Sequence, residues 1–321
     1  MEIRKSEILE EHHVVGSKKH IAVFTGGESK EREVSLVSGR GVCNSLKKLG
    51  YKYTSIDPGF DISDMLTRVK PDLVFNALHG TYGEDGRIPA LLDIMRIPYT
   101  HSGTLASAIA FNKEFCNSYL ANNGILIPNR KIINIKDKIT SEPLPRPYVV
   151  KPIAEGSSVG VEVVFKEDNF DIIGYIHAVG DHYGDRLIVE EYIPGREIQV
   201  GIVNNKAIDV LEIKTHRKFY DYEAKYAPGG SEHIMPVDMK PEKRKEVLEI
   251  SEKIHKLIGA KDISRVEFRY NDDPKVDKFF FLEINTHPGF TPTSIVPEIA
   301  SFHGISYDQI IETLVGNARC F

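Results

Sequence analysis

The chain has 321 residues, of which 41% are hydrophobic and 27% are charged, and its formal net charge at pH 7 is −5. Such a chain can bury a large core spread over two or three domains. The negative charge and the dispersed basic residues argue against nucleic acid as a partner. No apolar run is long enough to cross a bilayer, and the first twenty residues lack the apolar segment of a signal peptide. We therefore expect a cytoplasmic protein with no membrane partner.

The three cysteines, Cys43, Cys116 and Cys320, lie far apart and lack the spacing of a metal site. This usage is typical of reduced thiols in a cytosolic protein. We expect each of them to serve packing rather than chemistry.

The first segments predict a loose N-terminal extension followed by a strand and a helix. Residues 1–17 are rich in charged residues and histidine and are expected to be the extension. A short buried strand over residues 20–25 ends at a two-glycine turn, and a helix opens near Glu31 with apolar residues at helical spacing.

Residues 18–104 predict a doubly wound parallel-sheet domain. Strand-like segments at 53–56 and 72–78 flank a helix around Met65. Ligands of such sheets bind at the carboxyl ends of the strands, where His79 lies between Leu78 and a glycine. The two-glycine turn near residue 26 is also compatible with a purely structural turn.

The central region, residues 105–194, contains a helical stretch with Lys113 and a strand that ends near Lys151. The glycine- and serine-rich loop at 155–160 follows this strand and lacks Walker spacing. Its backbone N–H groups and Lys151 could hold phosphates, although an ordinary hairpin fits equally well.

The C-terminal region, residues 195–321, begins after a strand and a Pro-Gly turn at 187–197. Glu190 and Glu197 lie on that segment and are candidates to accept hydrogen bonds from a ribose or an adenine, or else are solvated carboxylates. The aromatic, charged and glycine-rich composition of residues 214–232 is typical of a mobile lid. A helix is expected at 242–257.

Two strand-like runs near the C-terminus predict a hairpin with a polar face. Alternation places Arg265 with Glu267 on one run and Glu283 with Asn285 on the other. If the polar faces coincide, two carboxylates, an amide oxygen and an arginine converge, which suits magnesium beside a phosphate. A solvated polar face is the alternative for this hairpin considered by itself.

Taken in order, these segments resemble the D-alanine–D-alanine ligases of the ATP-grasp superfamily. The resemblance extends from about residue 20 to the C-terminus. It rests on an SRVEF strand and on the motifs GGESKEREVS, ALHGTYGEDG, VVKPIAEGSSVG, FYDYEAKY and EINTHPGFTPTS.

The resemblance implies an α/β protein in which an N-terminal doubly wound parallel-sheet domain precedes a two-part ATP-grasp fold. It also implies that the protein forms a homodimer and binds ATP and D-alanine. ATP would phosphorylate the carboxylate of one D-alanine, and the amine of a second would attack the acyl phosphate, giving D-alanyl-D-alanine for peptidoglycan synthesis.

The same resemblance assigns the nucleotide and metal residues. Glu267, Glu283 and Asn285 would hold two Mg²⁺ or Mn²⁺ ions, and a monovalent cation near ATP is allowed. Two cations and several lysines suit a site that must hold a carboxylate beside a polyanion. The ATP contacts would be Lys113, Lys151, Ser157, Ser158, Glu190, Glu191, Ile193, Glu197, Lys225 and Asn285.

On the substrate side, Glu31 would receive the ammonium of the first D-alanine, and His79 lies near that subsite. The resemblance pairs Arg265 with the backbone N–H of Gly289 to stabilise the tetrahedral intermediate, and Ser294 with the carboxylate of the second substrate. Tyr226, linked through Ser157 to Glu31, would close the site and favour D-alanine over D-lactate as the second substrate.

Two positions depart from the family pattern or vary within it. Glu267 replaces the usual aspartate, which preserves charge and leaves mono- or bidentate coordination open. His287 is expected to be a solvent-facing turn residue. Two alternatives to the ligase are another ATP-grasp carboxylate-amine ligase and a non-catalytic nucleotide-binding paralogue. The motifs GGESKEREVS and FYDYEAKY argue against the first, and the retained Arg265, Glu283 and Asn285 argue against the second.

Overall fold

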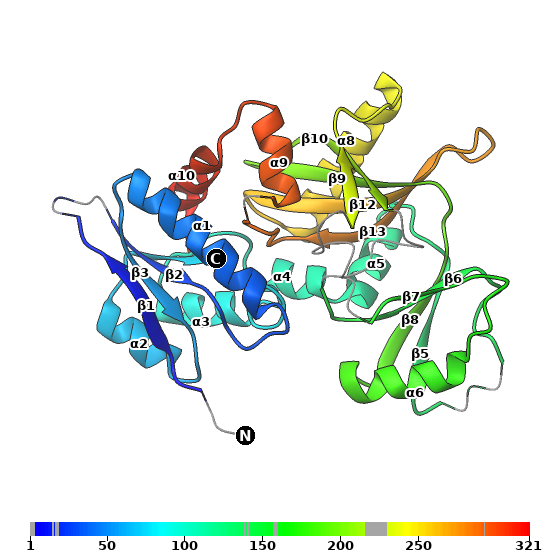
Figure 1. Cartoon of the computed structure of the whole chain (residues 1–321), viewed down its shortest axis with the longest axis horizontal. Helices are drawn as coiled ribbons and strands as arrows, with labels where there is room; N and C mark the ends of the chain where they lie inside the picture. Colours follow the sequence, from blue (N-terminus) through cyan, green and yellow to red (C-terminus); the bar gives the residue numbers. More distant parts are fainter. Residues whose placement is uncertain are drawn as a thin grey trace.

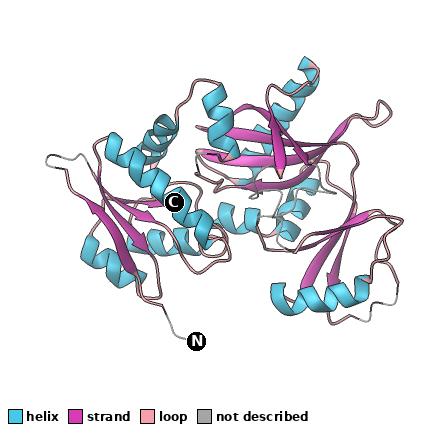
Figure 2. Cartoon of the chain, in the orientation of Figure 1, coloured by secondary structure: helices cyan, strands magenta, loops and turns pink. Residues whose placement is uncertain are grey.

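The computed structural model describes the chain except for residues 1–3, 15, 17–18, 138, 140, 157–159, 216–229 and 292. The described residues form three β-sheets with helices packed against them. In the view of Figure 1 the N-terminal sheet lies on the left, and the other two sheets lie one above the other on the right. Figure 2 shows α4 (Thr104–Phe111) and α5 (Lys113–Asn122) between these parts.

The N-terminal sheet has the strand order β1-β3-β2-β4, and its three last-named strands are parallel. Side chains on alternate positions of β2 enter two different cores, one beneath α1 and α10 and one beneath α2 and α3. Helices therefore cover both faces, which confirms the doubly wound prediction. The elements are β2 (His20–Phe24), β3 (Lys52–Asp57), β4 (Leu73–Asn76), α1 (Arg32–Lys48), α2 (Ile62–Val69), α3 (Arg87–Met95) and α10 (Tyr307–Asn317).

The prediction of a loose extension over residues 1–17 is wrong for β1 (Glu7–His12), which pairs antiparallel with β3 at the edge of this sheet. Before β1, Arg4 forms an ion pair with the buried carboxylate of Asp57, and Ser6 donates its backbone N–H to Asp61 at 2.6 Å. The strand is mostly exposed, so it lacks the apolar alternation by which a half-buried strand is recognised.

The central sheet has the order β5-β8-β6-β7, and all its pairs are antiparallel. Its strands are β5 (Arg130–Asn134), β6 (Tyr148–Pro152), β7 (Glu162–Val164) and β8 (Arg186–Glu191). Helix α6 (Ile172–Tyr183) covers one face, where Ile172 and Ile176 pack against Val150 and Val189.

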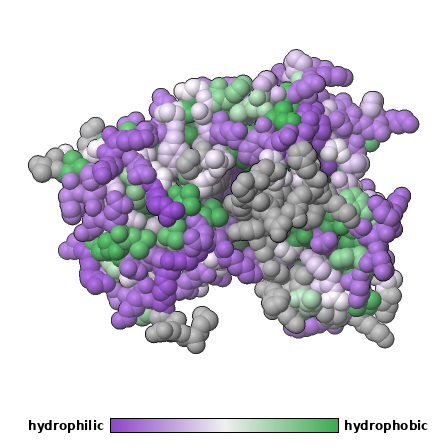
Figure 3. All heavy atoms as spheres, viewed as in Figure 1, coloured by the Kyte–Doolittle hydropathy of each residue, from purple (hydrophilic) through white to green (hydrophobic). Residues whose placement is uncertain are grey.

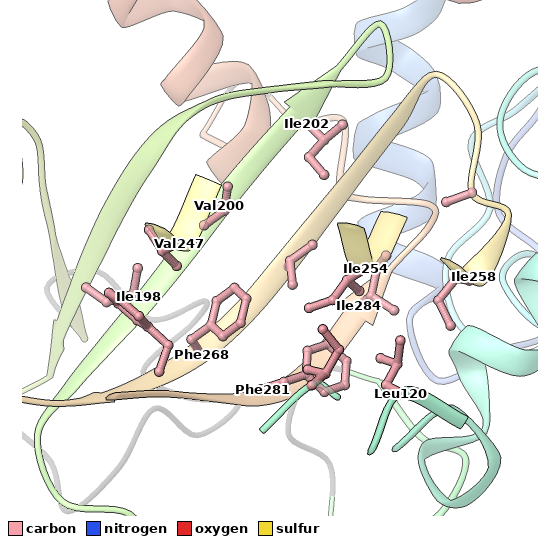
Figure 4. Close-up of a cluster of buried hydrophobic side chains, with 14 of the residues drawn as sticks. Leu120, Ile198, Val200, Ile202, Val247, Ile254, Ile258, Phe268, Phe281 and Ile284 are labelled. Atoms are coloured by element: carbon pink, nitrogen blue, oxygen red, sulfur yellow. The ribbon is translucent and has the colours of Figure 1, made fainter. Parts of the chain in front are cut away.

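The C-terminal sheet has the order β11-β10-β9-β12-β13. Helix α8 (Pro241–Ile258) packs with α4 and α5 on one face, where Phe268 and Phe281 are fully buried, as Figure 4 shows. Helix α9 (Ile295–Phe302) packs on the other face through Ile299. The strands are β9 (Arg196–Val203), β10 (Lys206–Thr215), β11 (Ser231–Ile234), β12 (Ile263–Asn271) and β13 (Lys278–Asn285).

The surface is mainly polar on the face drawn in Figure 3, where hydrophobic side chains form small, separate patches. Within the described part of the chain, no helix has the length and hydropathy needed to cross a membrane. All three cysteines are free thiols, with Cys43 and Cys116 buried and Cys320 exposed.

Candidate active site

Two cavities meet beneath the hairpin formed by β12 and β13. One, of about 460 Å³, lies between the central and C-terminal sheets. The other, of about 560 Å³, lies between the N-terminal domain and the C-terminal sheet. Both are lined by Lys113, Glu155, Glu267 and Glu283. Ligands in the two cavities would therefore approach each other at these four side chains.

The β12–β13 hairpin was predicted from the sequence and is confirmed. Arg265 lies opposite Asn285, and Glu267 lies opposite Glu283, so the four polar side chains share one face. A bulge directly after Glu267 interrupts the register. Glu267 is buried and paired with the guanidinium of Arg265, whose Nε also donates to Oε1 of Gln199 at 3.0 Å. The polar face is therefore an ordered ionic cluster, not a solvated surface.

Lys113 places a positive charge beside these carboxylates. It is the first residue of α5, and the side chain of Asn112 caps the helix. Its Nζ lies 3.0 Å from Oε2 of Glu283 and donates to the carbonyl of Glu155 at 2.6 Å. Burial alone would lower the pKa of Lys113, but the nearby carboxylates, led by Glu283, outweigh burial and raise it. The ammonium is therefore retained at neutral pH, as a phosphate ligand requires.

Lys151 brings a second cation into the first cavity. It lies near the end of β6, and its ammonium donates to Oε1 of Glu190 on the neighbouring strand β8. Both side chains are buried, so each charge needs the other in the absence of a ligand. Lys151 still lines the cavity, so its ammonium could contact a bound phosphate as well as Glu190.

The rest of this first cavity combines apolar walls with carboxylates. Val149, Val163 and Ile213 contribute apolar surface of the kind that holds a planar ring. All the described residues predicted to contact ATP line it except Asn285, which lines the second cavity instead. Those in the first cavity are Lys113, Lys151, Glu190, Glu191, Ile193 and Glu197.

The second cavity brings together every residue predicted to bind substrate that the structure describes. These residues are Glu31, His79, Arg265, Gly289 and Ser294. Glu31 is buried directly before α1, with one carboxylate oxygen so close to Gly156 that an added Cβ there would lie 2.8 Å from it. A buried carboxylate at this place suits an ammonium group.

Gly289 and Ser294 lie side by side in the loop between β13 and α9. A Cβ at Gly289 would lie 2.7 Å from the Ser294 hydroxyl, so any larger residue would displace that hydroxyl. The hydroxyl of Ser294 accepts the backbone N–H of Thr291 at 2.9 Å, and Ser294 precedes the first turn of α9. A helix N-terminus and a hydroxyl together suit a carboxylate.

The donor set fits magnesium if a ligand completes it. Glu267 and Glu283 offer hard oxygens, and Oδ1 of Asn285 accepts one hydrogen bond, from the N–H of His287 at 2.7 Å, which leaves it a lone pair. Among the described residues, no three His, Cys, Asp or Glu side chains are grouped to hold a metal. Phosphate oxygens would have to supply further ligands, as is usual for Mg²⁺.

The prediction that His287 faces solvent is wrong. Only 3% of it is exposed, and its Nε2 donates to the carbonyl of Asn76 at 2.6 Å. Burial, with smaller contributions from His101 and His79, lowers the pKa of His287 well below its ordinary value. Burial and then His79 lower the pKa of His101 to about 3. Both rings are therefore neutral at physiological pH.

Four predicted residues lie outside the described part of the chain: Ser157, Ser158, Lys225 and Tyr226. The same is true of most of the predicted lid, residues 216–229. Their roles remain predictions.

Two described residues at the site were missed as site residues. Glu155 lines both cavities, and burial raises its pKa despite Lys30 and Lys113. Gln199 lies opposite Glu267 across β9 and β12 and holds Arg265. Its position two residues after Glu197 on one strand was a usable signal, because alternate residues share a face.

The chain is similar over most of its length to ligases that carry D-alanine in their names. Two family models match, "D-ala D-ala ligase N-terminus" over residues 59–102 and "D-ala D-ala ligase C-terminus" over residues 128–316. The D-alanine–D-alanine ligase of Rickettsia canadensis is 52% identical over 299 residues, which cover 93% of this chain and 83% of that protein. That of Rickettsia massiliae is 49% identical over 314 residues, covering 96% of each.

Solved structures agree with the sequence comparisons. The D-alanine–D-alanine ligase of Bacillus anthracis complexed with ATP superposes with a TM-score of 0.80 at 26% identity, covering 93% of this chain and 96% of that one. The D-Ala:D-Ser ligase VanG of Enterococcus faecalis gives a TM-score of 0.75 at 27% identity, covering 93% and 98%. The ATP-grasp architecture predicted from the sequence is therefore confirmed.

Proposed function

Because this chain belongs to the D-alanine–D-alanine ligase family, we propose that it joins two D-alanine molecules at the junction of the two cavities, using ATP. The observation that carries this proposal is the set of four side chains common to both cavities. The γ-phosphate of ATP in the first cavity would meet the carboxylate of D-alanine in the second at Lys113, Glu267 and Glu283. The product is a precursor for peptidoglycan synthesis.

The reaction has two steps. A carboxylate oxygen of the first D-alanine attacks the γ-phosphorus, the bond to the β-phosphate oxygen breaks, and ADP and D-alanyl phosphate form. The neutral amine of the second D-alanine then attacks the carbonyl carbon. The tetrahedral intermediate expels inorganic phosphate, and the nitrogen loses a proton to give the peptide bond.

The nucleotide side of the site neutralises charge. Lys113 and Lys151 contact the phosphates, while Val149, Val163 and Ile213 hold the adenine against Ile193. Glu267, Glu283 and Asn285 hold two Mg²⁺ or Mn²⁺ ions, which supply positive charge where the phosphoryl group is transferred. The family resemblance also allows a monovalent cation.

The substrate side orients two amino acids. Glu31 receives the ammonium of the first D-alanine, with His79 beside it. Arg265 and the N–H of Gly289 stabilise the oxyanion of the tetrahedral intermediate. Ser294, at the start of α9, receives the carboxylate of the second D-alanine.

Phosphate release tests the proposed function. Purified protein with ATP and magnesium is assayed with D-alanine, with L-alanine and with no amino acid. We expect release that depends on D-alanine, together with a product of the mass of the dipeptide. Equal release with all three would refute a D-alanine ligase.

The second substrate is D-alanine rather than D-lactate. This assignment rests on the family resemblance at Tyr226 and in the full-length lid motif, both of which lie outside the described residues. Competition between D-alanine and D-lactate near pH 7, with the products separated by mass, should give predominantly the dipeptide. Predominant D-alanyl-D-lactate would contradict this assignment.

The segment from 214 to 232 acts as a lid over bound nucleotide. Hydrogen exchange across residues 218–231 should slow when ATP and a substrate analogue bind, whereas equal exchange in both states would contradict closure.

The protein acts as a cytoplasmic homodimer. Sedimentation velocity of the purified chain would test whether it is a dimer.

A further inference from the structure

His101 has a backbone conformation that its side chain does not favour. Its φ is +75°, in the left-handed region that glycine adopts freely and other residues rarely adopt. It is 2% exposed and follows Thr100, whose backbone N–H donates to the carbonyl of Val74 in β4 at 3.1 Å. Such a conformation persists only where its surroundings determine it, and it is often found at functional positions.

The ring of His101 is stacked on the ring of His287. The ring centroids are 3.9 Å apart and the planes differ by 29°. The edges of Phe75 and Phe290 approach the same ring, with centroids at 5.6 and 5.5 Å. His101 and Phe75 belong to the N-terminal domain, whereas His287 and Phe290 belong to the loop after β13. The stack therefore joins two regions that are far apart in the sequence.

His287 is fixed at both ends. Its ring Nε2 donates to the carbonyl of Asn76 at the end of β4, at 2.6 Å, and this bond sets the proton on Nε2. Its backbone N–H donates to Oδ1 of Asn285 at 2.7 Å. One residue thus connects the N-terminal sheet directly to the side chain of Asn285.

The loop is also attached beyond His287. The backbone N–H of Phe290 donates to the hydroxyl of Ser38 on α1 at 3.4 Å, and the hydroxyl of Tyr307 donates to the carbonyl of Phe290 at 2.9 Å. Gly289 lies between these attachments and His287. Its position relative to Glu31 and His79 therefore depends on how the loop docks on the N-terminal domain.

We propose that the stacked pair His101 and His287 is an interdomain latch, formed by two positioning residues, that sets the distance between the first-substrate subsite and the loop carrying Gly289 and Ser294. The inference rests on the proposed function, because the two subsites must hold the reacting carbonyl and amine together. The left-handed backbone at His101 is the cost of placing an aromatic ring where glycine would fit more easily.

The substitution His101→Gly tests whether the His101 ring affects catalysis separately from its effect on stability. Glycine suits φ of +75°, so the backbone is relieved while the ring is lost. The lost ring leaves a cavity among Phe75, His287 and Phe290, so we expect the melting temperature to fall, with part of the loss offset by the relieved backbone. Measured well below that melting temperature, kcat with D-alanine should still fall about tenfold, since small displacements of reacting groups are costly. A purely structural histidine would lower the melting temperature and leave kcat at that temperature unchanged.

Substitution of His287 tests the other half of the latch. His287→Ala should lower kcat about a hundredfold, because it loses both the stack and the bond to Asn76. His287→Gln keeps a donor for the Asn76 carbonyl and should recover part of the loss. In each variant the KM for D-alanine should rise. The KM for ATP should change less than about twofold, because neither histidine lines the first cavity, which is proposed to hold the nucleotide.

His255→Gln is the matched control. His255 is also buried, with Nδ1 2.8 Å from the Ser264 hydroxyl and Nε2 3.1 Å from Oδ1 of Asn205. These partners lie on β12 and in the turn between β9 and β10, not in the loop after β13. The substitution should lower the melting temperature without changing kcat or the KM for D-alanine.

Wild-type kinetics for His101→Gly and His287→Ala would overturn the latch and leave the ligase intact. Absence of D-alanine-dependent turnover in the unchanged protein would instead refute the proposed function. Additive effects of His101→Gly and His287→Ala on log kcat would also overturn the latch, because two halves of one contact must be coupled.

Discussion

The two cavities are built in different ways. Most charged side chains of the first cavity, the proposed nucleotide cavity, lie on regular elements. Their partners follow from strand pairing, as Lys151 on β6 pairs with Glu190, its diagonal neighbour on β8. The substrate cavity, the second of the two, is assembled from α1, the segment after β4, β12 and the loop after β13. That loop is held by His287, which docking on the N-terminal domain buries. The geometry of the substrate cavity therefore depends on tertiary packing between distant segments, whereas that of the nucleotide cavity follows largely from local pairing.

This difference in construction predicts which kinetic constant a substitution in each cavity should change. Variants confined to the nucleotide cavity should change the KM for ATP, and variants of the substrate cavity should change kcat or the KM for D-alanine. Variants at the junction should affect both.

Glu283→Gln, at the junction, should have the largest effect. Glu283 lines both cavities and lies 3.0 Å from the ammonium of Lys113, so losing its charge removes a proposed metal ligand and the partner of that lysine. We expect kcat to fall about a thousandfold at unchanged far-UV circular dichroism. Glu249→Gln, an exposed carboxylate on α8, is the control and should keep full activity. Normal turnover of Glu283→Gln at low magnesium would remove Glu283 from the metal site.

Arg265→Ala should lower kcat about a hundredfold and affect the KM for ATP little. Arg265 lines the substrate cavity and not the nucleotide cavity, and the oxyanion it would stabilise exists only in the second step. Arg265→Lys keeps the charge but loses the two-pronged contact with Glu267 and should be intermediate. A normal kcat with only a raised KM for ATP would assign Arg265 to the nucleotide instead.

The same division explains what the sequence could and could not predict. Alternation along two strands was enough to place Arg265, Glu267, Glu283 and Asn285 on one face, because register within a hairpin is local. It could not place His287, since a turn residue becomes buried only when a distant domain covers it. The left-handed backbone of His101 has no periodic signal either.

The N-terminal edge strand β1 escaped prediction for a related reason. Its side chains are mostly exposed, so its order comes from backbone pairing with β3 and from the ion pair between Arg4 and Asp57. Neither leaves an apolar pattern in the sequence.

Lys151→Met should raise the KM for ATP about tenfold and leave the KM for D-alanine unchanged, since a lost charge-assisted contact with phosphate weakens binding by roughly that factor. It also leaves Glu190 buried without its cation, which should lower stability. The double variant Lys151→Met/Glu190→Gln should recover stability but not ATP affinity. Recovery of both would show that Lys151 serves only to balance Glu190.

Asp209→Asn lies outside both cavities and should change stability without changing kinetics. The Asp209 carboxylate is buried and accepts Nε of Arg244 at 2.7 Å and Nε2 of His303 at 2.6 Å. Burial raises its pKa, but Arg244, the N–H of Val210 and His303 together outweigh burial, so the pKa is lowered. We expect a loss of about 2 kcal/mol at pH 7, below the value for a fully buried pair because Arg244 and His303 are partly exposed.

The pH dependence of that loss identifies its cause. A carboxyl group whose pKa is lower in the folded state stabilises the fold above its unfolded pKa of about 4, and the contribution disappears as pH falls through the folded pKa. The difference in melting temperature between wild type and Asp209→Asn should therefore be constant from pH 7 to about 5 and narrow towards pH 3. Asp185→Asn, which removes an exposed partner of Lys136, should show almost no difference at any pH. A gap for Asp209→Asn that stays constant down to pH 3 would mean that hydrogen-bond geometry rather than charge holds α8 and α9 together at this point.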